Sequence, residues 1–256
     1  KFYMIYFSLA IGLIMIIFLS YATSELWRKY INTKTISRFL FPGTIVHELS
    51  HALICLSTGT TIKELNLFSS NNTGIKHDKP KVPFVFDFII ASAPIFACAA
   101  LIFLIAKLLS NPIHLNNTFP HEIHFSLKGL FDLIRHLLDA AWVTLNAFWN
   151  QLHLGNIHHV LFLLAIIIFT VSMSPHRQDI KPLVIGFVVL SIILFFIEKA
   201  GVDLLKYWWW SYCIKELWVI IPLTISVLST LLFVTLLIMG FVKGFRLTFG
   251  HKSSSK

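Results

Sequence analysis

The chain has 256 residues, of which 56% are hydrophobic and only 13% are charged. Because soluble domains carry about a quarter charged residues and disordered tails are poor in hydrophobic ones, both classes are excluded. The formal net charge is +9, yet no run of Lys and Arg exceeds two residues. A nucleic-acid partner is therefore not expected, and the positive charge favours contact with anionic lipid heads. The composition predicts an integral membrane protein in a lipid bilayer.

Six apolar runs predict membrane-spanning helices, since about 20 residues cross the hydrocarbon core. They are residues 2–22, 39–57, 82–109, 159–173, 182–197 and 217–242. The first could also be a signal peptide, but we predict a retained helix because the run is long and no small-residue cleavage site follows it. With six spans, the carboxyl end of the second and the turn between the fourth and fifth lie on the same side of the membrane.

Three further segments complete the predicted fold. Residues 60–68 and 74–82 flank a run of turn formers, which predicts a small β-hairpin, expected to dip into the membrane. Apolar residues recur at helical spacing over 127–148, with charged residues on the other face, which predicts an interfacial amphipathic helix. The aromatic residues 207–210 are typical of a membrane boundary before the last span. We expect an all-α polytopic membrane protein with about six transmembrane helices, forming one integral membrane domain over 1–256.

The second span contains the motif HExxH, formed by His47, Glu48 and His51 within the sequence PGTIVHELSHA. Histidines four residues apart project from one face of a helix, so two imidazoles can bind one zinc ion. Glu48 is then placed to accept a proton from a water molecule at the metal. Titratable side chains in an apolar span are costly unless they face a cavity, a partner or a metal. The alternative is a polar cluster that lines a transport path or holds helices together.

A catalytic zinc usually takes a third protein ligand and leaves one position for water. Asp179 is the best candidate, because it lies at the head of the fifth span, on the side toward which His51 points. The alternative is that Asp179 is the N-cap of the fifth helix, with Pro182 in its first turn. His176 and Arg177 precede it and are candidates for stabilising a transition state or contacting substrate, or else a turn residue and a lipid-facing charge.

These motifs resemble the intramembrane zinc metalloproteases of the site-2 protease type, in particular their small prokaryotic relatives. The resemblance rests on the HExxH segment, Thr58-Gly59-Thr60 and the later Ser-Pro-x-Arg-x-Asp, and covers about residues 39–184. It implies one Zn²⁺ per chain held by His47, His51 and Asp179, with Glu48 as the catalytic base. It also implies a transmembrane protein substrate and a location in a prokaryotic cytoplasmic membrane. The sequence departs from the family at Asp179, which is followed by Ile180 where a glycine often stands.

Two other interpretations stay open. The chain could be a non-catalytic membrane protein, either a transporter or a pseudoprotease that binds transmembrane segments. A second metal site is conceivable in the interval between the third and fourth spans, although its His-Glu-Ile-His run lacks the spacing that one helix face requires. That interval holds seven histidines: His114, His121, His124, His136, His153, His158 and His159.

Overall fold

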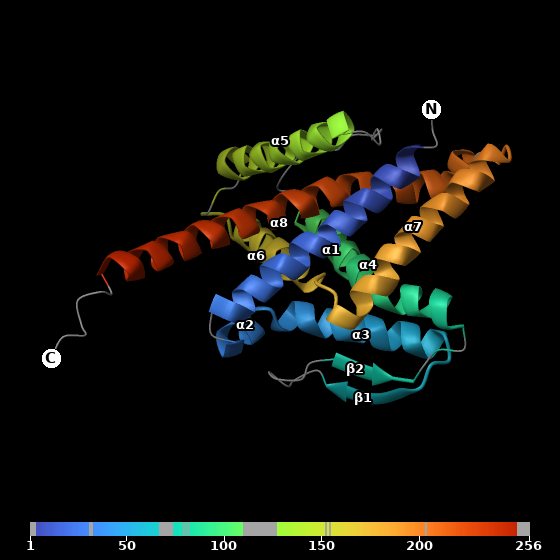
Figure 1. The fold of residues 1–256 in the computed structure, drawn as a ribbon, viewed down its shortest axis with the longest axis horizontal. Coiled ribbons are helices and arrows are strands. Elements are labelled where there is room, and N and C mark those ends of the chain that lie inside the picture. The colour runs from blue at the N-terminus through green and yellow to red at the C-terminus, as the bar shows by residue number, and fades with distance from the viewer. Residues whose placement is uncertain are drawn as a thin grey trace.

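The computed structural model describes residues 4–30, 33–66, 74–78, 80, 82–109, 127–151, 153, 155–202 and 204–249. Within these residues the chain is mostly helical, with one two-stranded sheet (Figure 1). In chain order the elements are α1 (Met4–Tyr30), α2 (Thr33–Phe39), α3 (Phe41–Ser57), β1 (Ile62–Asn66), β2 (Gly74–His77), α4 (Pro83–Leu108), α5 (Leu127–Gln151), α6 (Ile157–Ser172), α7 (Arg177–Lys199), the 3-10 turn η1 (Leu204–Lys206) and α8 (Trp208–Phe249).

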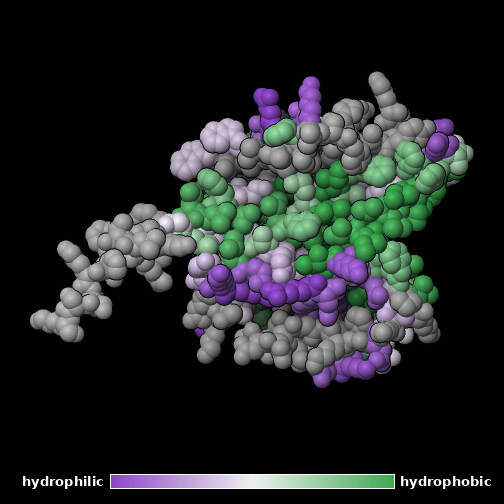
Figure 2. All heavy atoms as spheres, in the orientation of Figure 1, coloured by the Kyte–Doolittle hydropathy of each residue, from purple (hydrophilic) through white to green (hydrophobic). Residues whose placement is uncertain are grey.

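All six predicted spans are helices, and four helices of the described chain are long and apolar enough to cross a membrane: α1, α4, α7 and α8. The second and fourth predicted spans, α3 and α6, have 17 and 16 residues, and α6 is an apolar helix below the length of a full span. On the face drawn in Figure 2, an apolar band runs between polar margins. These features indicate a helical membrane protein.

The core forms where α1, α4, α6, α7 and α8 pack together, and its buried residues are almost all aliphatic or aromatic. Close approaches tighten this packing. A Cβ atom added at Gly186 of α7 would lie 2.0 Å from the ring of Phe88 on α4, so only glycine allows the two helices to come this near. The core thereby fixes α7 relative to α4, which also packs against α3 and α6.

The predicted hairpin is present as the antiparallel pair β1 and β2, in which Leu65 is paired with Ile75 and Asn66 with Gly74. Both strands contact α3 (Figure 1). The predicted amphipathic helix is also present, as α5, which packs along α8. Several large α5 side chains are exposed, including Phe131, Trp142 and Trp149.

The aromatic segment before the last span differs from the prediction in one respect. The helix α8 begins at Trp208, so the three tryptophans form its first turn instead of preceding it. Trp208 and Trp209 are exposed, whereas the Trp210 indole Nε1–H donates to the Tyr6 hydroxyl at 3.2 Å. This contact ties the start of α8 to α1.

Candidate metal centre

The HExxH motif lies in the middle of α3 and faces inward. Pro42 stands in the first turn of this helix, where its missing N–H costs no hydrogen bond. His47 and His51 are each 5% exposed and Glu48 is 1% exposed. The helical spacing predicted from the sequence therefore places both imidazoles on one buried face.

His47 is held by the last turn of α6. Its Nδ1 lies 2.7 Å from the carbonyl oxygen of Ser172. Because a carbonyl only accepts, Nδ1 carries the proton and Nε2 presents a lone pair, and Nε2 has no hydrogen-bond partner in the described structure. A buried imidazole nitrogen in this state, with its other nitrogen fixed by a carbonyl, is the arrangement of a metal ligand.

Gly43 permits this contact between α3 and α6. A Cβ atom added there would lie 2.1 Å from the Ser172 hydroxyl oxygen and 3.0 Å from Ile168 Cγ2. Any larger residue would separate the two helices, and the Ser172 carbonyl would move away from His47. Gly43, one helical turn before His47, thus helps to position the His47 ring.

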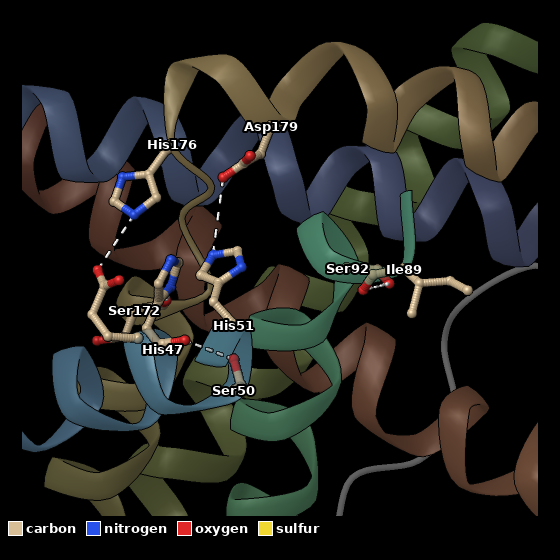
Figure 3. Close-up of polar contacts among 9 residues, drawn as sticks. His47, Ser50, His51, Ile89, Ser92, Ser172, His176 and Asp179 are labelled. Carbon is tan, nitrogen blue, oxygen red and sulfur yellow. Dashed lines mark hydrogen bonds and ion pairs between the residues drawn. The ribbon is translucent and has the colours of Figure 1, made fainter. Parts of the chain in front are cut away.

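The start of α7 brings two more polar side chains to this face (Figure 3). The helix begins at Arg177 with His176 as its N-cap, and Asp179 lies in the first turn. The N-cap interpretation of Asp179 is therefore wrong, and Pro182 falls beyond the first turn, inside the helix. Asp179 Oδ2 instead lies 3.9 Å from His51 Nε2, with its side chain 13% exposed.

His176 joins the two motif histidines. Ligand atoms of His47, His51 and His176 all lie within 4.8 Å of one another. Their ring centroids are 5.0 Å apart for His47 and His51, 5.1 Å for His47 and His176, and 6.0 Å for His51 and His176. Imidazoles that share one tetrahedral zinc ion have centroids roughly 5 Å apart, given Zn–N bonds of about 2.0–2.1 Å. The residues present therefore fit a zinc ion.

Glu48 extends the cluster on the other side of His176. Its Oε1 lies 3.3 Å from His176 Nε2. In the metal-free protein, the hydrogen-bonding approach of this carboxylate raises the pKa of the His176 imidazole, and burial of the ring acts in the opposite direction. The pair places a carboxylate and an imidazole directly beside the candidate ligands.

Arg177 does not join the cluster. Its Nη2 lies 3.5 Å from Glu25 Oε1 on α1, and its side chain is 78% exposed. A polar cavity of about 190 Å³ lies beside it, and its lining includes Glu25, Arg28, Arg177 and His176. The cavity borders the candidate site at His176.

The seven histidines between the third and fourth predicted spans form no comparable group in the part of the chain that the structure describes, where the single group of three metal-ligating side chains is that of His47. His114, His121 and His124 lie outside the described residues. His153 and His159 stack with centroids 5.8 Å apart, and the backbone N–H of His153 donates to His159 Nδ1 at 3.0 Å. A second metal site is not supported within the described interval.

Comparison with known proteins finds no relative: no family model, no curated protein and no solved structure matches the chain.

The sequence alone placed His47, Glu48 and His51 together, and the structure brings Asp179 beside them. The place of His176 among the imidazoles was missed, because that residue was considered as a turn residue or for substrate or transition-state contact, and not as a ligand. Its signal was the HxxD spacing of His176 and Asp179, which puts both near one face of a first helical turn.

Proposed function

We propose that this protein is an intramembrane zinc metalloprotease of the site-2 protease type, which hydrolyses peptide bonds of transmembrane protein substrates. In this proposal His47, His51 and Asp179 hold one zinc ion and Glu48 is the general base. The observation that carries it is the meeting of the buried HExxH face of α3 with Asp179 of α7, which lies 3.9 Å from His51.

Each residue has a defined part in the reaction. Zinc, when bound, supplies a Lewis acid that polarises the peptide carbonyl and makes a water molecule acidic. Glu48 accepts the proton of the attacking water and delivers it to the leaving amine, so the carboxylate is restored after each turnover. The Ser172 carbonyl holds the His47 ring in the tautomer that leaves Nε2 available. The cavity lined by Glu25 and Arg28 supplies water.

The hairpin beside α3 suits the handling of a helical substrate. A transmembrane helix satisfies its own peptide groups, so its carbonyls are shielded until the segment is extended. Strand β1 or β2 can pair with an extended segment through backbone hydrogen bonds. Because both strands contact α3, a segment added there would run close to the HExxH helix.

Glu48→Gln tests the proposal. Wild-type and variant proteins are each reconstituted in liposomes with solubilised membrane proteins of the expression host, and new N-termini are identified by mass spectrometry. We expect products from the wild type, a loss of about 10²- to 10⁴-fold in Glu48→Gln, and equal zinc content in both. Glu216→Gln, remote from the cluster on α8, is the matched control and should retain activity. Zinc in the wild type with no product would favour the pseudoprotease, and no zinc would favour a transporter.

A further inference from the structure

His176 offers a ligand atom that the proposed zinc centre does not use. A ring nitrogen of His176 lies within 4.8 Å of the ligand atoms of both motif histidines. The centroids of the His47 and His176 rings are 5.1 Å apart, close to the 5.0 Å between the two proposed ligands His47 and His51. The distance from His47 to His176 is therefore as suitable for sharing one metal ion as the distance from His47 to His51.

The His176 ring also lies against the proposed general base. His176 Nε2 is 3.3 Å from Glu48 Oε1. A neutral imidazole nitrogen either presents a lone pair to a metal or carries a proton and donates it. A His176 ring that bound the metal through Nε2 would therefore not donate to Glu48 at the same time.

We propose that His176 is a fourth, displaceable protein ligand of the zinc ion, which closes the site at rest. Four protein ligands are typical of structural zinc sites, whereas a catalytic site needs one open position. If the His176 ring left a bound zinc ion, Nε2 would turn to the Glu48 carboxylate and one coordination position would open. The same movement of the His176 ring would then open the coordination position and bring the imidazole to the Glu48 carboxylate. This inference rests on the proposed function.

The chain around His176 suits such a movement. Residues 174–176 lie between α6 and α7 and belong to no helix, since α6 ends at Ser172 and α7 begins at Arg177. The His176 side chain is 28% exposed, and the ring borders the polar cavity between this segment and α1. His47 and His51, by contrast, are fixed within α3. Of the three imidazoles, His176 is the one with space beside it.

Cobalt substitution of the purified, reconstituted protein tests the proposal. In His176→Cys, a thiolate at the position of the displaced imidazole would bind Co²⁺ and give an intense near-ultraviolet sulfur-to-cobalt charge-transfer band. Arg177→Cys is the matched control, because that side chain points to Glu25, and it should give no such band. A wild-type-like cobalt spectrum without a charge-transfer band in His176→Cys would overturn the inference and leave the proposed function intact.

Two further measurements test the inference, one on the wild type and one on a variant. X-ray absorption of the zinc-loaded wild type should show three imidazoles at the metal, and two would overturn the inference. His176→Ala should lose zinc to a chelator at least tenfold faster than the wild type, because one ligand is missing. If the wild type binds neither cobalt nor zinc, the inference and the proposed function fail together.

Discussion

Two groups of histidines in this protein have opposite characters. His47, His51 and His176 converge in a buried cluster beside two carboxylates. His153 and His159 also stack, but His153 is exposed and the His159 ring accepts a backbone hydrogen bond at Nδ1. The interval between the third and fourth predicted spans, which contains His153, holds more histidines than the cluster around His47. A buried imidazole lone pair needs a hydrogen-bond donor or a cation as its partner, whereas a solvated ring is satisfied by water. The motif histidines of α3 are buried and His153 is not, so the first group is the better candidate for a metal centre.

Removing the motif imidazoles should have the largest effect. The double variant His47→Ala/His51→Ala leaves only the side chains from the start of α7, so zinc content per chain should fall from about one to near zero. The matched double variant His153→Ala/His159→Ala should keep the wild-type content. Mass spectrometry of metals in the purified proteins makes the comparison, and equal zinc loss in both would remove the distinction between the two groups.

Asp179→Ala should weaken zinc binding without abolishing it. Its carboxylate lies 3.9 Å from His51 Nε2, and the imidazoles remain when it is lost. We expect at least about a tenfold fall in affinity, measured by competition with a chelator of known strength. Asp139→Ala on the exposed face of α5 serves as control, and an unchanged affinity in Asp179→Ala would exclude the aspartate as a ligand.

Gly43→Ala should disturb the centre from a distance. The added Cβ would lie 2.1 Å from the Ser172 hydroxyl oxygen, so we expect a loss of about 1–3 kcal/mol in stability from overpacking. Displacement of the Ser172 carbonyl should also lower zinc affinity by about 10- to 100-fold. Gly240→Ala in α8 has nothing within 4 Å of the new Cβ and should leave zinc affinity unchanged.

The smallest expected effect is a pH dependence of the metal-free protein. The pKa of His176 is raised from 6.5, first by the Glu48 carboxylate, whose Oε1 lies 3.3 Å from His176 Nε2. A group whose pKa is higher in the folded state contributes stability that is fully present below its unfolded pKa and is lost as pH rises through the folded one. The thermal midpoint of the wild type should therefore exceed that of His176→Gln most below about pH 6.5. A difference that grows with rising pH would show that the pair does not form.

The sequence determined the features that depend on local periodicity. Apolar runs predicted the helices, because burial in hydrocarbon requires about 20 consecutive apolar residues. The i, i+4 spacing placed His47 and His51 on one face, because the α-helix repeats every 3.6 residues. The run of turn formers between two strand-like segments predicted the hairpin for a similarly local reason.

Only the tertiary structure decided which distant side chains meet. His47 and Ser172 are 125 positions apart, and their contact depends on a close approach of α3 to α6 that Gly43 allows. The helix α7 has His176 and not Asp179 as its N-cap. Asp179 and His176 lie beside the motif, and Arg177 lies beside Glu25 of α1. Successive residues of an α-helix are rotated by about 100° about its axis, so neighbouring side chains face different partners. Helix packing thus brought His176 to the motif histidines. The HxxD spacing could pair His176 with Asp179, but it could not show that both would meet α3.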